Sequence, residues 1–163
     1  MFTTLNKTQK RILNFITPTL QAGARLGDMI LEVLTQKTLL MGAKIGTPTI
    51  SVGVEGASAT NARDVTININ DLLGAALAGK RQVFVWLSDS AAAAASSVAP
   101  DGGISPQSSG ILIKADTANI VGRYLSNSSG VLVLRITEST AKTYYINVIV
   151  GESAVVSAAV AFA

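Results

Sequence analysis

Residues 65–70 read Val-Thr-Ile-Asn-Ile-Asn, and this short stretch decides the fold class. Apolar and polar residues alternate strictly, so an extended chain would carry Val and Ile on one face and only Thr and Asn on the other. The pattern predicts a half-buried antiparallel strand with one face against a core and one face in water.

Similar short β-like segments, bounded by Gly, Asn, Asp and Ser, follow one another from residue 47 onward. We expect eight strands, over residues 49–54, 64–70, 82–88, 111–115, 122–126, 131–137, 143–150 and 155–162. Their spacing and local antiparallel links predict a mainly β protein built as an antiparallel β-sandwich. Immunoglobulin-like and jelly-roll topologies both stay open.

Three finer expectations concern particular segments of this sandwich. Residues 82–88 and 143–150 are apolar on both faces, which predicts central strands or strands with a covered outer face. Trp86, the only tryptophan, is expected to anchor the core. The small-residue stretch 89–110 is expected to be a long surface excursion.

Residues 1–46 differ from the rest in charge and in period. Six of the 13 cations and two of the 10 anions lie there, which gives a net charge of +4, against −1 for the remainder. Apolar residues in this part recur with a helical period. We therefore predict an α-helical N-terminal arm over residues 1–46 and a β-sandwich domain over residues 47–163.

The arm is predicted to contain two amphipathic helices, and in the first of them four apolar residues share one face. Those helices either pack on their own domain or, as we favour, bury their apolar faces on another subunit, because the β-domain has enough apolar residues to close a core alone. The residues expected to bind a partner are Leu5, Lys7, Lys10, Arg11, Ile12, Leu13, Ile16, Ile30, Val33 and Leu34.

The residue types that are missing exclude several classes of chemistry. The chain has no Cys and no His, so Cys nucleophiles, Ser-His-Asp triads, haem ligation and most zinc sites are ruled out. Gly74, Gly79 and Lys80 match part of a phosphate-binding loop, but Arg81 stands where Ser or Thr is required. We expect no enzymatic activity, no metal and no cofactor.

Membranes and nucleic acids are not expected partners either. No apolar run reaches the ~20 residues of a membrane-spanning helix. The cations of the arm do not continue as a basic stripe into the β-domain, which nucleic-acid binding would favour.

Several segments, in their order along the chain, carry a resemblance to a known family. They are residues 65–69, 83–90, 99–103, 130–136 and 144–148, and a small apolar C-terminal segment that ends Ala161-Phe162-Ala163. Over about residues 49–163, this series resembles a recurrent domain of virion structural proteins of tailed bacteriophages. The resemblance implies a β-sandwich displayed on a virion, and it supplies no catalytic residue.

Composition points the same way, because only 14% of residues are charged, against roughly 25% in typical soluble domains. We expect a capsid decoration or cement protein, located in the virion after assembly in the host cytoplasm. Its arm would dock on the major capsid protein, on other virion proteins or on sister subunits, and a homotrimer is favoured over a dimer. The alternatives are a head- or tail-fibre component and a secreted immunoglobulin-like adhesion module.

Overall fold

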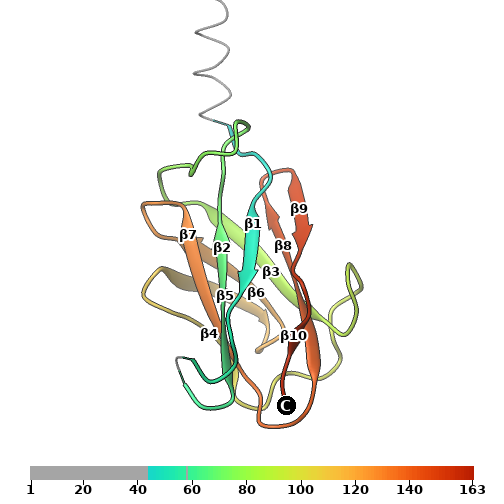
Figure 1. Ribbon diagram of the computed structural model, residues 1–163. Coiled ribbons are helices and arrows are strands. Elements are labelled where there is room, and N and C mark those ends of the chain that lie inside the picture. Colours follow the sequence, from blue (N-terminus) through green and yellow to red (C-terminus); the bar gives the residue numbers. More distant parts are fainter. Residues whose placement is uncertain (1–43, 58) are drawn as a thin grey trace, which may run out of the picture. The chain divides into compact units, whose positions relative to one another are not determined.

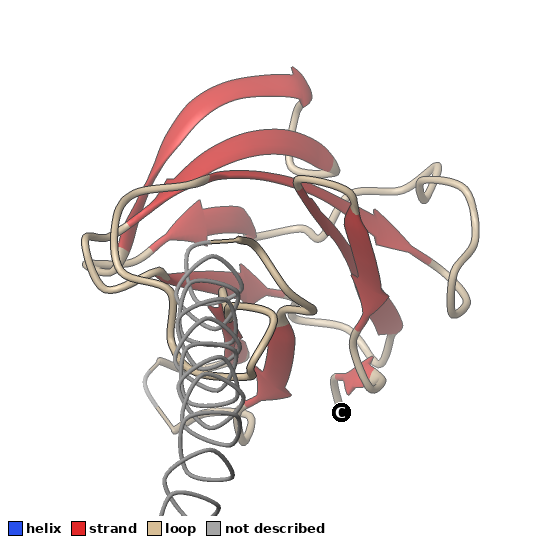
Figure 2. Ribbon diagram, turned by 90° about the horizontal axis from the view of Figure 1, so that it is seen from above, coloured by secondary structure: helices blue, strands red, loops and turns tan. Residues whose placement is uncertain are grey.

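The structure is a computed structural model that describes residues 44–57 and 59–163, and these form two antiparallel β-sheets packed as a sandwich (Figure 1). Residues 1–43 of the predicted helical arm lie outside the described residues, and its last three residues, 44–46, are described and form no helix. In the view from above, the strands form two layers joined by loops (Figure 2).

The two sheets are built from ten strands. The first sheet has the order β1-β2-β7-β4 and consists of β1 (Thr49–Val52), β2 (Ala62–Asn68), β7 (Val131–Thr137) and β4 (Gly103–Pro106). The second has the order β10-β8-β3-β6-β5, with β9 also paired to β8. Its strands are β10 (Val160–Ala161), β8 (Thr143–Val150), β3 (Gln82–Ser88), β6 (Val121–Ser126), β5 (Gly110–Thr117) and β9 (Ser153–Val156).

The alternation is confirmed over residues 65–69, in β2 and at Ile69, but Asn70, which was predicted to face water, is buried and its Nδ2 donates to the Thr47 carbonyl at 3.3 Å. Val65 and Ile67 are fully buried and pair across the sheet with Leu134 and Leu132 of β7. Thr66 and Asn68 alternate with them, face outward and are half-buried. Apolar side chains of both sheets meet between the layers, and the core includes Val65, Ile67, Ile69, Val83, Val85, Leu87, Leu132, Leu134, Ile136, Tyr144, Ile146 and Val148.

The two segments that are apolar on both faces form the interior strands β3 and β8, as predicted. The expectation that Trp86 anchors the core is wrong. Alternation turns Leu87 inward and places Trp86 beside Phe84 on the outer face, where the rings lie 5.7 Å apart. The Trp86 Nε1 donates to the Ala93 carbonyl at 3.0 Å, so the loop after β3 covers part of this face.

The stretch 89–110 is more than a surface excursion, because it contains β4. This four-residue strand pairs with β7, with Ile104 opposite Ile136. It lies at the edge of its sheet and ends at Pro106, and an edge is where a sheet tolerates a residue without an N–H. Three of its four residues are Gly, Ser and Pro, so its sequence shows no alternation of apolar and polar residues, and the strand was not predicted.

The predicted C-terminal strand over residues 155–162 is two strands, β9 and β10, separated at Ser157. The buried Ser157 hydroxyl accepts the Ile146 N–H at 2.9 Å and donates to the Ala158 carbonyl at 2.7 Å. A side chain therefore replaces part of the backbone ladder at this point.

The described chain joins the sandwich at Ile45. This residue pairs with Asp71 in an isolated bridge, and the Gly46 N–H donates to the Asn70 carbonyl at 2.8 Å. The C-terminus lies at the other end of the sandwich (Figure 1), where the Ala163 N–H donates to the Glu55 carboxylate at 3.2 Å.

Candidate interaction surface

All ten expected partner-binding residues of the arm lie outside the described residues. The candidate surface of the described chain is instead β5, an edge strand of the second sheet. Three consecutive residues of β5 are large, apolar and about half exposed: Ile111 at 57%, Leu112 at 44% and Ile113 at 52%. Soluble proteins normally cover or blunt a long apolar edge strand, so β5 is a surface suited to contact with a partner.

The register with β6 leaves one of these three side chains, that of Ile113, without an opposite residue. Leu112 faces Tyr124 and Lys114 faces Arg123, so Ile113 lies in a bulge and has no opposite residue on β6. Bulges and lysines are two devices that protect an exposed edge from pairing. In β5 the bulge is at Ile113 and the lysine is Lys114, whereas residues 110–112 contain neither a bulge nor a lysine.

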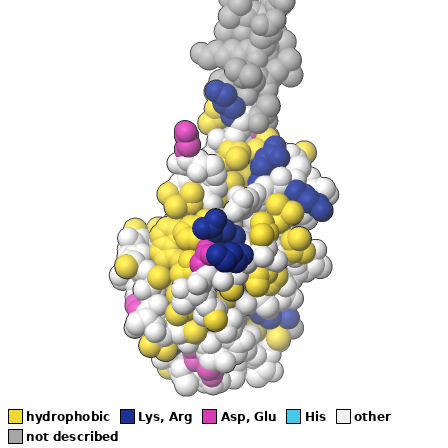
Figure 3. Space-filling view, turned by 180° about the vertical axis from the view of Figure 1, so that it is seen from behind, with side chains coloured by type: hydrophobic (Ala, Val, Ile, Leu, Met, Phe, Trp, Pro, Cys, Tyr) yellow, Lys and Arg dark blue, Asp and Glu magenta, His cyan; other side chains and the backbone are white. Residues whose placement is uncertain are grey.

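The C-terminal half of β5 ends in a small cluster of charges. The Asp116 carboxylate lies 3.1 Å from the Lys114 Nζ and 2.9 Å from the Arg123 Nε. The hydrogen bond from Arg123, then that from Lys114, lowers the pKa of Asp116. The Arg123 guanidinium also lies 5.9 Å from the centre of the Phe84 ring. The view from behind shows hydrophobic side chains around a small group of cationic and anionic ones (Figure 3).

A second feature of the outer face is a hollow of about 250 Å³ beside the indole of Trp86, lined also by Ala92, Asn147 and Val156. The polar group here is already engaged, because the buried Asn147 Nδ2 donates to the Ser88 hydroxyl at 2.7 Å. Ala92 has a φ of 54°, a left-handed conformation that costs a non-glycine residue about 1–2 kcal/mol. The lining is suited to binding an apolar group, and it contains no acidic or basic side chain.

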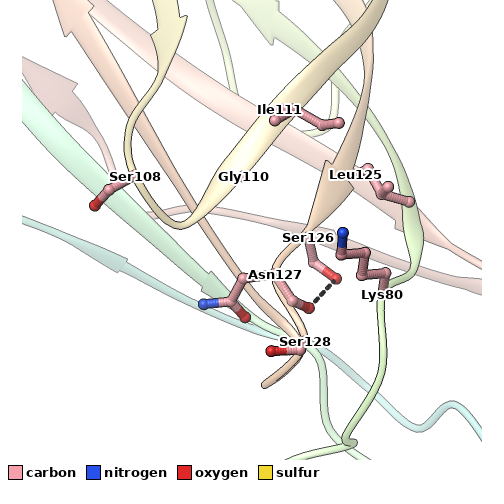
Figure 4. A pocket seen from close by; sticks show the side chains of 8 residues that line it. All are labelled: Lys80, Ser108, Gly110, Ile111, Leu125, Ser126, Asn127 and Ser128. Carbon is pink, nitrogen blue, oxygen red and sulfur yellow. Dashed lines mark hydrogen bonds between the residues drawn. The ribbon is translucent and has the colours of Figure 1, made fainter.

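A third feature is a hollow of about 240 Å³ near the β6–β7 turn, lined by serines and Lys80 and also by Ile111 and Leu125 (Figure 4). The Ser126 hydroxyl accepts the Arg81 N–H at 2.9 Å and donates to the Asn127 carbonyl at 3.2 Å. The Asn127 Oδ1 accepts two backbone N–H groups, those of Ser129 and Val131, each at 2.9 Å. These groups shape the turn, and no carboxylate among the lining residues could act as a general base.

Two further carboxylates of the sandwich accept hydrogen bonds that hold neighbouring segments. Asp64 accepts two hydrogen bonds from Arg135, at 2.8 and 2.9 Å. The Asp71 Oδ1 accepts the N–H groups of Leu73 and Ala75, at 2.8 and 2.9 Å, and so closes the turn after β2. Among the residues that the structure describes, no group of three acidic side chains could hold a metal ion.

Glu138 is a buried acidic residue whose side chain belongs to a network of hydrogen bonds. It accepts hydrogen bonds from the Thr140 hydroxyl at 2.6 Å, the Thr140 N–H at 3.1 Å and the Tyr144 hydroxyl at 2.8 Å. The bonds from Thr140 lower the pKa of Glu138 more than burial raises it. Burial, and then the bond to Glu138, raises the pKa of Tyr144. The network fixes the connection between β7 and β8.

No protein-family model and no curated protein matches this chain. In the described part of the chain, no helix has the length and apolar character needed to cross a membrane. The chemistry of the surface is therefore the guide to what the protein does.

The β5 surface was not expected from the sequence, which indicated only a strand over residues 111–115. The signal that could have revealed it is the run Ile111-Leu112-Ile113, because three consecutive apolar residues break the alternation of a half-buried strand. Such a run also fits a strand buried on both faces. Only the strand order, which places β5 at an edge, separates the two interpretations.

Proposed function

We propose that this protein is a non-enzymatic structural protein of a virion, and most specifically a capsid decoration or cement protein. In this role the N-terminal arm docks on the major capsid protein, on other virion proteins or on sister subunits, and the chain forms a homo-oligomer, with a trimer favoured. The sandwich carries the exposed face.

The exposed apolar edge of β5 is the observation that carries a structural role for the protein. The sandwich closes its own core with fully buried residues of both sheets, yet it keeps Ile111, Leu112 and Ile113 about half exposed. A protein surrounded by neighbours in an assembly can keep such a surface, whereas a free monomer is prone to aggregate through it. The side chains of Ser126 and Asn127 in one hollow, and of Asn147 in the other, are engaged in hydrogen bonds within the protein.

Within the sandwich, we propose the immunoglobulin-like arrangement over the jelly roll. If β2, β3, β7 and β8 are taken as strands B, C, E and F, the first sheet has the order A-B-E-D and the second contains the F-C pair. Strands β6 and β5 then lie where variable-type domains add C′ and C″ beside C. The chain reaches them after the D position rather than before it, which departs from the immunoglobulin order.

A fibre component of the head or tail is the second candidate. The same sandwich would then sit on a trimeric stalk formed by the arm, and the trimer would be stable without a capsid. A secreted adhesion module is the third, and its sandwich would be a free monomer.

Binding of the full-length protein to capsid shells that lack it tests the proposal, with one substitution on each side of the first predicted helix. Ile16→Asp places a charge in the centre of the apolar face, and Asn14→Asp places the same charge on the opposite face. We expect sedimentation with shells for the unaltered chain and for Asn14→Asp, and loss of it for Ile16→Asp.

Two other outcomes would replace the decoration role. If the unaltered chain binds no shell but is a trimer that Ile16→Asp dissociates, the fibre role takes its place. A monomer that neither binds shells nor responds to Ile16→Asp would favour the adhesion module.

A further inference from the structure

The outer face of the second sheet carries a buried asparagine, Asn147, among apolar neighbours. The strand registers place Asn147 of β8 directly opposite Trp86 of β3 on one side and Val156 of β9 on the other. Directly opposed residues share a face, so these three side chains form a row across the sheet. Asparagine is mostly found at exposed positions, whereas Asn147 is only 3% exposed. An apolar residue would fill this place without needing hydrogen-bond partners.

The hydrogen bonds within the protein satisfy only part of the Asn147 amide. A carboxamide offers two N–H donors and one accepting oxygen. One N–H donates to the Ser88 hydroxyl at 2.7 Å, and that hydroxyl donates to the Ser90 carbonyl at 2.7 Å. Within residues 44–57 and 59–163, the Asn147 oxygen and its second N–H have no hydrogen-bond partner. The amide therefore keeps one acceptor and one donor for another molecule.

Asn147 lines the hollow beside Trp86, together with Ala92, Ala154, Val156 and the neighbouring Val155. The indole N–H is already used in the bond to the Ala93 carbonyl, and the other lining side chains are apolar. Asn147 is thus the side chain that can form hydrogen bonds to a molecule in this hollow. A charged molecule would lose its hydration here without gaining a counter-ion, so the lining favours an uncharged one.

The size of the hollow limits what it can hold. Its volume is about 250 Å³. An enclosed apolar cavity of about 150 Å³ binds benzene, so this hollow has room for one six-membered ring with a small substituent. An amide substituent offers an N–H and a carbonyl oxygen, which match the free oxygen and the free N–H of Asn147.

We propose that this hollow binds a small uncharged molecule with a ring-shaped apolar body and an amide group, and that Asn147 recognises the amide. The ring would lie against the indole of Trp86 and the side chain of Val156. The site involves no residue of β5 or of the arm, and it does not depend on the virion role proposed above.

Fluorescence of the full chain measures binding directly, because Trp86 is the only tryptophan and it lines the hollow. Benzamide is the probe. Benzoate, which has the same shape but a negative charge and no N–H, and toluene, which has no polar group, are its controls. We expect a saturable change with benzamide and at least about tenfold weaker binding of both controls, because each leaves the buried amide unpaired.

A pair of matched variants tests the role of Asn147. Asn147→Leu replaces the amide with an apolar side chain of similar size, so benzamide should bind at least about tenfold more weakly. The free energy of unfolding should stay unchanged or rise, since a buried leucine needs no partner. Asn68→Leu makes the same change at a half-buried position on the outer face of the first sheet and should leave benzamide binding unaltered.

Urea denaturation shows whether each variant is folded. If Asn147→Leu does not fold, Ala154→Phe replaces it. Ala154 is exposed and lines the hollow, so a phenyl ring there would fill the space and leave the bond between Asn147 and Ser88 in place. This variant should lose benzamide binding.

The proposal is overturned if benzamide causes no saturable change, or if benzoate or toluene binds as tightly. It is also overturned if Asn147→Leu lowers stability and binds benzamide unchanged, since Asn147 would then serve the fold alone. Equal losses of binding in Asn68→Leu and Asn147→Leu would place the site elsewhere. Shell binding is measured separately, so failure here is distinct from failure of the virion role.

Discussion

Glu138 is only 3% exposed to solvent, yet its side chain is a negatively charged carboxylate. It can do so because Thr140 and Tyr144 supply three donors to its two oxygens. A buried carboxylate that loses a donor keeps the full cost of its desolvation. The stability of the β7–β8 connection should therefore depend on each member of this network.

Removing the Tyr144 hydroxyl should destabilise the protein. Tyr144→Phe keeps the ring in the core and deletes the 2.8 Å bond to Glu138, so we expect a loss of about 1–3 kcal/mol in the free energy of unfolding. Urea denaturation at neutral pH measures it. Tyr145→Phe removes the same atom from the half-buried next residue and should stay within about 0.5 kcal/mol of the unaltered chain. Equal effects at both positions would contradict a role for the network.

Acidification should weaken the fold partly through the same side chain. The pKa of Glu138 is lowered in the folded state from a usual value of 4.5, so the unfolded chain takes up this proton more readily. Its contribution is complete above that usual value and is lost as the pH falls through the lowered pKa. Denaturation at pH 7 and pH 3 should show a smaller drop for Glu138→Gln than for the unaltered chain.

Part of the acid effect should survive that substitution, because the pKa values of Asp101 and Asp116 are lowered as well. Hydrogen bonds from Ser139 cause the first shift and those from Arg123 and Lys114 the second. A drop as large in Glu138→Gln as in the unaltered chain would show that Glu138 contributes nothing to it.

The side of the sheet on which Trp86 lies could not be predicted from the sequence. A lone tryptophan in an apolar strand is a reasonable core anchor by size. In a strand, however, alternate residues face opposite sides. Val83 and Val85 of β3 face the core, so Trp86 faces outward. Both faces of β3 carry apolar residues, so alternation alone could not tell which set was inward.

The β6–β7 turn contacts the connection that follows β2 through backbone atoms. Gly130, in the β6–β7 turn, has a φ of 74°, and its carbonyl accepts the Ile69 N–H at 2.8 Å. A Cβ atom on Gly130 would collide with the carbonyl oxygen of Leu77. This glycine is therefore required both for its conformation and for the close approach.

Substituting Gly130 and Gly56 separately distinguishes the cost of the left-handed conformation from the cost of the steric collision. Gly56 has nearly the same φ, 73°, but no atom lies within 4 Å of the place where its Cβ would be. Gly56→Ala should cost only the conformational term, about 1–2 kcal/mol, and Gly130→Ala should cost at least about 1 kcal/mol more. Guanidinium denaturation of both variants gives the difference, and equal losses would argue against the collision.

Elements with regular patterns were predictable and elements defined by their neighbours were not. The alternation in β2 and the apolar faces of β3 and β8 placed these strands correctly. β4 was missed because Gly103, Ser105 and Pro106 form a strand only by pairing with β7. The break at Ser157 was missed for a similar reason, since its hydroxyl substitutes for a backbone partner of β8.

At the scale of the whole molecule, the side chains of the sandwich core come from distant parts of the sequence, from Val65 to Phe162, with Ile45 packed against them. The surface that the structure offers to a partner could not be predicted, because it depends on which strand is outermost. The sequence indicates the sandwich through local patterns, and strand order is a property of distant pairings.

The point at which the chain joins this core can be located by truncation. A chain of residues 44–163 should unfold in one cooperative transition. Starting at Thr47 instead removes Ile45 from its bridge to Asp71 and the Gly46 bond to Asn70, and should lower the free energy of unfolding by about 1–3 kcal/mol. Thermal and urea melts compare the two chains. Identical stabilities would place the start of the folded unit after Gly46.

The last residue, Ala163, lies beside Glu55 at the end of the sandwich away from Ile45. A peptide or fluorophore grafted after Ala163 would leave the domain from that far end, without crossing β5 or the place where the chain comes in. Since the sequence given contains no cysteine, one cysteine added there would give a unique attachment point for cargo on this chain. The geometry makes the domain a ready carrier for display.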